Sequence, residues 1–541
     1  MINGDDTVTI TDCDTAATGT LAVPATIDGR PVTSIGNTAF DRCSSLTAIT
    51  LPDSVTSIGD RAFDGCTSLA SINIPDGVTS IGINAFRNCS SLAGVTLPDS
   101  VTSIGDRAFQ NCTSLTGGIE FPDSLTTIGI NAFDNCTGLA GGIEFSDSLT
   151  SIGGSAFRGC TSLTTITLPD SLTSIGLSAF QDCTSLVSID VSTGNPAYAS
   201  VEGVLFNKNQ TNLVQYPAGK SGAYSIPDSV TGIGVGAFRS CAGLTTITLP
   251  DSLTSIGDEA FEDCSTLTGI TLPDSLTTIE ARAFQNCTSL AGGIEFPDSL
   301  TSIGLSSFRD CNRLAEVTFG ANSALTTIGS FAFFSCNDLA EVTFGANSAL
   351  TSIGQGAFAN GPSLTTITLP NNPISFGFGA FSSNPSSLAN IAVHIGTGTL
   401  AIPTSVICQA SATLTLLGST EVAALEQQIA ALQATLSARD AQIAGLEAEV
   451  ALLEQRPTLE ELQDARLGSV VLFTELTDGG TSEVSFDFNL ELTDDLTSWT
   501  PVANGTWFPS FSGGVRLTVP LAAEKKYFRV VMELEDEGES D

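Results

Sequence analysis

Residues 51–73 read LPDSVTSIGDRAFDGCTSLASIN, and variants of this stretch recur along most of the chain. The shared pattern is L-P-D-S-[VL]-T-[ST]-I-G-x-x-A-F-x-x-C-x-x-L, and its phenylalanine returns every 23 to 25 residues, with one longer interval. A period of this length is typical of a solenoid, in which each repeat stacks on its neighbours. The fourteen ladder phenylalanines are Phe40, Phe63, Phe86, Phe109, Phe133, Phe157, Phe180, Phe238, Phe261, Phe284, Phe308, Phe333, Phe358 and Phe381.

Each repeat reads as one rung with two extended segments. Leu46, Ile49 and Leu51 form a short aliphatic run that predicts a strand, and Pro52 suits its end because proline lacks an N–H group. The following Asp-Ser predicts a turn held by side-chain bonds to nearby backbone N–H groups. Thr-Ser-Ile-Gly predicts a second extended segment, and Ala-Phe is expected to open a tight helical turn. Stacked rungs would lie about 4.8 Å apart.

Twelve of the 14 cysteines follow a ladder phenylalanine by three residues, from Cys43 to Cys336. An even number of cysteines suggests disulfides. Equivalent side chains on stacked rungs, however, point the same way at about 4.8 Å, whereas bonded Cβ atoms need about 3.5–4.5 Å. We therefore expect buried free thiols that fill the core.

The core I-G-x-x-A-F-x-x-C-x-x-L resembles the BspA-like leucine-rich repeat family of bacterial surface proteins, over residues 5–395. The longer interval between ladder phenylalanines also resembles that family. It contains three segments that are similar to the family's inserted hairpin, namely Asn195-Pro196, Val201–Phe206 and Tyr216–Lys220. The resemblance implies a secreted or surface-displayed protein that binds or adheres. Its ligand would be a protein or a glycan.

The predicted fold class is mostly β. A leucine-rich-repeat solenoid of parallel strands is followed by a coiled-coil helix and a small antiparallel β domain, for which Ser469–Phe473, Val484–Leu492, Val515–Val519 and Tyr527–Met532 are strand candidates. The predicted segments are an N-terminal cap (1–31), the solenoid (32–395) with a hairpin insertion (191–225), a cap or linker (396–418), the coiled coil (419–456), a short helix (457–467), the β domain (468–534) and an acidic tail (535–541).

The predicted coiled coil carries apolar residues at alternating steps of three and four, which is a heptad pattern. It predicts self-association as a dimer or trimer, with Arg439 setting the register. The alternative is a single amphipathic helix that lies on the solenoid. The seam consists of Val422, Leu425, Ile429, Leu432, Leu436, Arg439, Ile443, Leu446, Val450 and Leu453.

The net charge is −39, from 58 acidic and 19 basic residues. Such a chain could not neutralise phosphates, so we expect no nucleic-acid binding. No stretch is long enough to span a bilayer. The residues after Met1 do not read as a signal peptide. Since the resemblance implies export, we expect an extracellular or cell-surface location.

One repeat position faces outward at the end of the first strand, and exposed strand faces are where solenoids bind partners. This strand column is the candidate binding face. The alternative is a surface that only favours β structure and solubility. Its residues are Thr50, Asn73, Thr96, Glu120, Glu144, Thr167, Asp190, Thr248, Thr271, Glu295, Thr318, Thr343 and Thr368.

A second column contains the aspartate that follows the repeat proline. Stacked carboxylates such as Asp53, Asp76 and Asp99 could bind structural calcium, although one carboxylate per rung is few for an ion that takes six to eight oxygens. Turn formation in water is favoured over the metal. The remaining members are Asp123, Asp147, Asp170, Asp228, Asp251, Asp274 and Asp298.

We expect no catalytic residues, because the single histidine, His394, lacks the partners that triads and zinc sites need. The sequence therefore predicts a non-catalytic interaction or adhesion protein, whose coiled coil multiplies the repeat surface and raises avidity. The alternative is a structural subunit of an extracellular assembly or filament.

Overall fold

The computed structural model describes residues 1–116, 119–370 and 373–382, the strands of the C-terminal region, and the helical residues 431, 435 and 439. The chain divides into two compact units. Unit 1 comprises Met1–Gly292 and Ser307–Arg313, and unit 2 comprises Gly293–Ser306 and Leu314–Asp541.

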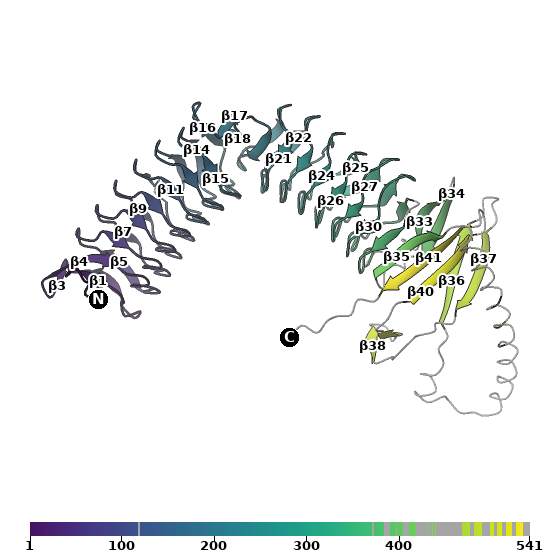
Figure 1. Cartoon of the computed structure of the whole chain (residues 1–541), viewed down its shortest axis with the longest axis horizontal. Coiled ribbons are helices and arrows are strands. Elements are labelled where there is room, and N and C mark those ends of the chain that lie inside the picture. Colours follow the sequence, from purple (N-terminus) through teal and green to yellow (C-terminus); the bar gives the residue numbers. More distant parts are fainter. Residues whose placement is uncertain are drawn as a thin grey trace, which may run out of the picture. The chain divides into compact units, whose positions relative to one another are not determined.

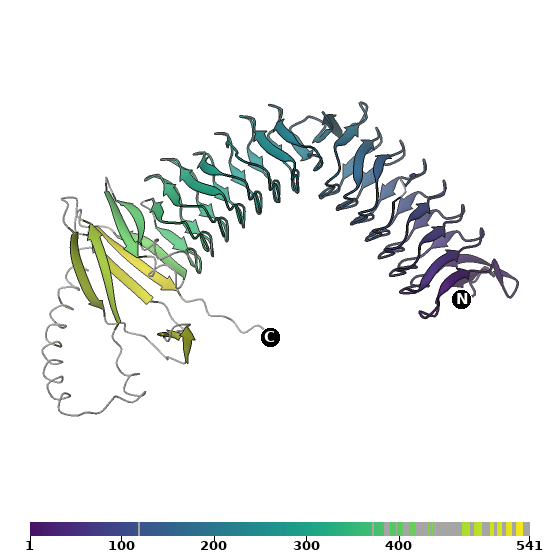
Figure 2. The ribbon, with the colours of Figure 1, turned by 180° about the vertical axis from the view of Figure 1, so that it is seen from behind.

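Unit 1 is a stack of rungs with two rows of short parallel strands, seen from both sides in Figures 1 and 2. The register steps by one repeat, since Ser80 pairs with Ser103 and Ile81 with Ile104. This confirms the predicted solenoid of parallel strands. The first row contains β2 (Gly19–Ala22), β5 (Leu46–Thr50), β7 (Ser71–Asn73), β9 (Gly94–Thr96), β12 (Gly141–Glu144), β14 (Leu163–Leu168), β16 (Ser188–Val191), β20 (Gly222–Ser225) and β22 (Leu244–Thr248).

The second row runs along the Thr-Ser-Ile-Gly segments. Its first strand lies in residues 1–31, the segment predicted as a cap, and pairs in parallel with the next rung. The row contains β1 (Val8–Ile10), β4 (Arg30–Ile35), β6 (Ser57–Ile58), β8 (Ser80–Ile81), β10 (Ser103–Ile104), β11 (Thr127–Ile128), β13 (Ser151–Ile152), β15 (Ser174–Ile175), β21 (Gly232–Ile233), β23 (Ser255–Ile256) and β24 (Thr278–Ile279), and β3 (Thr26–Ile27) pairs with β4.

The Ala-Phe segment is not helical, so the prediction of a helical turn is wrong. The backbone N–H of Phe63 donates to the carbonyl of Ala85 on the next rung at 2.7 Å. Left-handed residues bracket the phenylalanine, with φ of 56° at Arg61 and 74° at Gly65. The backbone bonds that a helix would form within one rung are therefore replaced in part by bonds between rungs.

The ladder phenylalanines form the core. Phe133 has none of its surface exposed, and its ring centroid lies 5.2 Å from those of Phe109 and Phe157, in near-parallel planes. The twelve ladder cysteines are buried, as predicted. The thiols from Cys43 to Cys311 are also placed to donate hydrogen bonds to backbone carbonyls, for example from Cys136 Sγ to the carbonyl of Phe109 at 3.0 Å. Burial raises the pKa of the Cys183 thiol to about 12.

Hydroxyl side chains link successive rungs. Ser54 Oγ donates to the Val32 carbonyl at 2.7 Å, one rung earlier. Thr126 Oγ1 likewise donates to the Thr102 carbonyl at 2.9 Å. Ser54 therefore does not bond to the N–H groups of its own turn, so the prediction is wrong for the serine, and the turn is closed by the backbone bond from Val55 N to the Pro52 carbonyl at 3.0 Å.

The longer interval contains an antiparallel hairpin, β17 (Tyr198–Val201) with β18 (Val204–Asn207), followed by β19 (Asn212–Gln215). Tyr216 takes the place of a ladder phenylalanine. Its N–H donates to the Ala237 carbonyl at 2.7 Å, and its ring lies 4.9 Å from that of Phe238. The aromatic stack that continues to Phe238 therefore begins inside the insertion.

Unit 2 repeats the two strand rows. Its first row contains β25 (Gly292–Phe296), β27 (Leu314–Phe319), β29 (Glu341–Phe344), β31 (Thr366–Leu369), β33 (Asn390–Ile395) and β34 (Gly398–Pro403). Its second row contains β26 (Ser302–Ile303), β28 (Thr327–Ile328), β30 (Ser352–Ile353) and β32 (Ile374–Phe376).

Antiparallel strands follow the last rung of unit 2. β32 pairs with β35 (Ser411–Leu417), which pairs with β41 (Lys526–Glu533), and β41 pairs with β40 (Val515–Leu521). Two hairpins, β36 (Gly468–Glu475) with β37 (Thr481–Phe488) and β38 (Ser498–Val502) with β39 (Thr506–Ser510), complete the strands. The predicted β domain falls partly on these strands.

The predicted coiled-coil seam lies outside the described residues, apart from Arg439, which is helical and exposed. Within the part of the chain that the structure describes, no helix has the length and apolar character needed to cross a membrane.

Candidate binding surfaces

The structure places eleven of the thirteen strand-column residues on the first strand row, and Glu120 and Thr271 lie on rungs whose equivalent segment is not a strand. Glu144 pairs with Thr167, and Thr167 pairs with Asp190, within unit 1. Ten of the thirteen members are exposed, and Thr318, Thr343 and Thr368 in unit 2 are half-buried. The inward residues between them, such as Ile166, are buried. The column is thus a row of outward polar side chains in each unit, interrupted in unit 1 by the hairpin insertion, and its role in binding stays a prediction.

The aspartate column lies in exposed turns. All ten of its carboxylates, including Asp53, Asp76 and Asp99, are exposed. Among the described residues, no group of three or more histidine, cysteine or acidic side chains is arranged to hold a metal ion.

A third column, which sequence reasoning missed, is formed by the residue after each ladder phenylalanine. In unit 1 these positions supply acids, bases and amides that bond from rung to rung. Arg158 donates to both carboxylate oxygens of Asp134 at 3.0 Å, and Gln110 donates to the same carboxylate at 2.8 Å. Arg87 and Asp64 form a similar paired contact at 3.1 and 2.7 Å. The sequence feature that could have predicted this column is the alternation of acidic and basic residues at this one repeat position.

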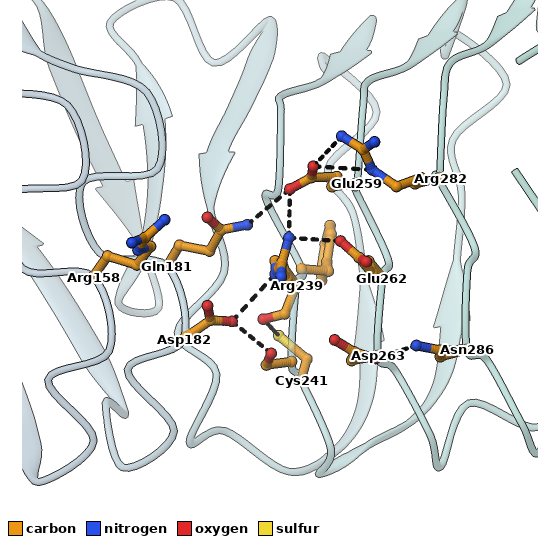
Figure 3. A network of polar contacts seen from close by, with 12 residues as sticks. Arg158, Gln181, Asp182, Arg239, Cys241, Glu259, Glu262, Asp263, Arg282 and Asn286 are labelled. Carbon is orange, nitrogen blue, oxygen red and sulfur yellow. Dashed lines mark hydrogen bonds and ion pairs between the residues drawn. The ribbon is translucent and has the colours of Figure 1, made fainter. Parts of the chain in front are cut away.

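At the insertion two members of this column, Arg239 and Glu262, belong to an ionic cluster centred on Arg239, shown in Figure 3. Its guanidinium lies 2.6 Å from Glu262, 2.5 Å from Glu259 and 3.3 Å from Asp182. Arg282 also pairs with Glu259. The equivalent position after Tyr216 is Pro217, so no charged side chain separates Arg239 from Asp182. The cluster therefore links rungs on both sides of the hairpin.

The acids of the cluster differ in their environment. Burial raises the pKa of Glu262, and the nearby Arg239 only partly opposes this. Burial also raises the pKa of Glu259, but its hydrogen bond to Arg282 and the charge of Arg239 outweigh burial and leave that pKa lowered. Burial and like charge favour the neutral carboxyl, whereas a guanidinium favours the charged one.

A pocket of about 640 Å³ opens beside this cluster, entirely within unit 1. It is lined by Asn111, Asn135, Arg158, Gly159, Asp182 and Arg239, among others. None of the strand-column residues lines it, so it is a separate surface on the turns that carry the ladder phenylalanines.

Comparison with known proteins agrees with the repeat geometry. The family described as "BspA type Leucine rich repeat region (6 copies)" matches residues 26–140, 117–219, 220–292 and 291–401. The chain belongs to the BspA-type leucine-rich repeat family. No curated protein is significantly similar to this BspA-type protein over its sequence.

Two solved structures are similar to the BspA-type chain. A leucine-rich repeat protein from Eubacterium ventriosum is 30% identical, with a TM-score of 0.54, over 62% of this chain and 88% of that one. A leucine rich cell surface protein from Faecalibacterium prausnitzii is 29% identical, with a TM-score of 0.53, over 72% of this chain and 93% of that one.

Proposed function

We propose that this BspA-type protein is a non-catalytic interaction or adhesion protein of the cell surface or the extracellular space. The observation that carries the proposal is the strand column, which is polar and outward-facing on each rung while the buried half of the repeat stays nearly the same. Solenoids use such extended surfaces for binding. The F. prausnitzii protein, a leucine rich cell surface protein, supports the location.

The partner is proposed to be a protein or a glycan. The test is to immobilise the full chain and measure its binding to a panel of extracellular matrix proteins and glycans. Saturable binding of at least one member supports an interaction function, and binding of none contradicts it.

We further propose that residues 419–456 multimerise the protein as a dimer or trimer. The heptad pattern from Val422 to Leu453 supports this. Two or three linked copies bind a multivalent surface with higher avidity without any new contact.

Light scattering over a concentration range tests the multimer. The expected mass is a fixed two or three times 55.6 kDa. The double variant Leu436→Asp/Leu446→Asp is expected to fall to the single-chain mass, because a charge at a seam position disrupts the apolar interface. A single-chain mass for the unaltered protein contradicts the multimer, and growth without limit favours a filament-forming subunit instead.

A further inference from the structure

The pocket beside the Arg239 cluster lies where one side chain is missing from a ladder of amides. Asn111 Nδ2 donates to Asn88 Oδ1 at 2.8 Å, and Asn135 Nδ2 donates to Asn111 Oδ1 at 3.0 Å. The next rung has Gly159 at this position, which cannot supply the next donor. A Cβ atom at position 159 would lie 3.7 Å from Asn135 Oδ1, in ordinary contact, so this position has room for a side chain that the glycine does not supply.

The polar groups of the pocket suit a ligand rich in hydroxyl groups. Gln110, Asn111 and Asn135 carry amides, and Thr161 and Thr184 carry hydroxyls. Amides and hydroxyls both donate and accept hydrogen bonds, as sugar hydroxyls do. The volume of about 640 Å³ lies in the range of about 300–1,000 Å³ that small-molecule sites occupy.

The charges of the pocket are balanced within the protein. Asp134 and Asp182 offset Arg158 and Arg239. Each guanidinium is already engaged, Arg158 by both oxygens of Asp134 and Arg239 by three carboxylates. The pocket therefore does not need an ionic ligand, and the net charge of −39 disfavours an anionic one.

A peptide is a poorer fit than a sugar. Protein partners are anchored mainly by aromatic and other large side chains in desolvated pockets. The lining of this pocket consists of glycine and of polar or charged side chains, with no apolar one among them. The only apolar surface that it offers such an anchor is that of the carbon atoms of these side chains and of the backbone.

We propose that this pocket binds a neutral saccharide. The inference rests on the proposed interaction function and gives it a second surface with a defined ligand class. The amides at the end of the ladder would bind sugar hydroxyls in the place that the missing side chain leaves free.

Gly159→Asn is the matched test. The preceding ladder asparagines have φ near 60°, and Gly159 has φ of 70°, so asparagine extends the ladder in a conformation that the fold already uses. It is expected to occupy the part of the pocket over Asn135 and to leave the thermal unfolding midpoint within a few degrees. The control is Gly65→Asn, at the same repeat position with φ of 74°, where the nearest atom to a Cβ would be Arg42 Cγ at 3.5 Å and the pocket is distant.

The probes are immobilised oligosaccharides of neutral hexoses and N-acetylhexosamines, with sialylated and sulfated oligosaccharides and short peptides in parallel, followed by calorimetry of any hit with the full chain. We expect at least one neutral oligosaccharide to bind the unaltered protein and Gly65→Asn equally, and Gly159→Asn at least tenfold more weakly. Binding of no neutral oligosaccharide, binding of anionic probes or peptides alone, or equal binding by Gly159→Asn overturns the proposal.

The strand column is tested separately in the same assay. The variant Glu144→Lys/Asp190→Lys changes that column and no pocket residue, so it is expected to bind the neutral oligosaccharide as the unaltered protein does. If it abolishes this binding while Gly159→Asn does not, the sugar site lies on the strand column, and only the pocket proposal fails.

Discussion

Replacing Phe133 with alanine is expected to lower the free energy of unfolding of unit 1 by about 3–5 kcal/mol, the usual cost of deleting a buried ring. Phe133 is fully buried and stacks at 5.2 Å on Phe109 and Phe157, and its ring meets the edge of Phe121 at 5.7 Å. The alanine would leave a cavity between two rungs. Because a solenoid is stabilised by contacts between neighbouring repeats, one weak interface lowers the stability of the stack.

Urea denaturation followed by far-ultraviolet circular dichroism measures this effect. The control is Phe378→Ala, which deletes the same ring at a site that is 58% exposed. It is expected to change the free energy of unfolding by less than about 0.5 kcal/mol. Equal losses in the two variants would show that the ladder is not the core of the fold.

Replacing Arg239 with methionine is expected to lower the free energy of unfolding by about 2–4 kcal/mol near neutral pH. This exceeds the value of under about 1 kcal/mol for an exposed ion pair and overlaps the lower part of the range of about 3–5 kcal/mol for breaking a buried one. The guanidinium side chain is 25% exposed, and that of Glu262 is 8% exposed. Without Arg239, Glu262 keeps a buried negative charge next to Glu259, which burial and like charge both disfavour.

The cost is expected to shrink as the pH falls to about 4, near the ordinary glutamate pKa of about 4.3. The pKa of Glu262 is already raised and rises further in the variant, so its carboxyl is neutralised earlier in the folded than in the unfolded protein, and acid relieves the penalty. The pKa of Glu259 is lowered in the unaltered protein, so the stability that it contributes is present above its unfolded pKa and is lost as the pH falls. Both effects reduce the difference in the free energy of unfolding between the variant and the unaltered protein at acidic pH.

Denaturation curves at the two pH values check this prediction. Adding Glu262→Gln to Arg239→Met should restore part of the loss at neutral pH, since it removes the unpaired charge. The exposed Arg61→Met is the control and should have little effect at either pH. A loss for Arg239→Met that is absent, or the same at both pH values, would mean that the cluster does not hold the rungs beside the hairpin.

The repeat spacing was enough to predict the strands of the solenoid, because equal positions such as Ile81 and Ile104 must stack when the period is regular. It could not predict the Ala-Phe segment, where bonds between rungs take the place of helical ones. Tyr216 was missed as a ladder member because the insertion places it off the 23-residue period and it is not a phenylalanine.

The pocket was missed for a different reason. It depends on an absent side chain at Gly159 and on the approach of Arg239 to Asp182 across the hairpin. Neither the space beside Gly159 nor the contact between Arg239 and Asp182 can be predicted from the pattern within a single repeat. The strand column could be predicted, since it is one repeat position on an exposed strand, but its partner is not encoded in the repeat that places it there.

The central claim is that recognition lies on the strand column and that the buried ladder is its scaffold. The most direct measurement compares two variants of the full chain for binding to the matrix protein found in the panel. Glu144→Lys/Asp190→Lys changes the strand column, and Asp123→Lys/Asp147→Lys makes the same change in charge at exposed turn residues. We predict at least tenfold weaker binding for the first and unchanged binding for the second. Equal binding by both variants would contradict the account.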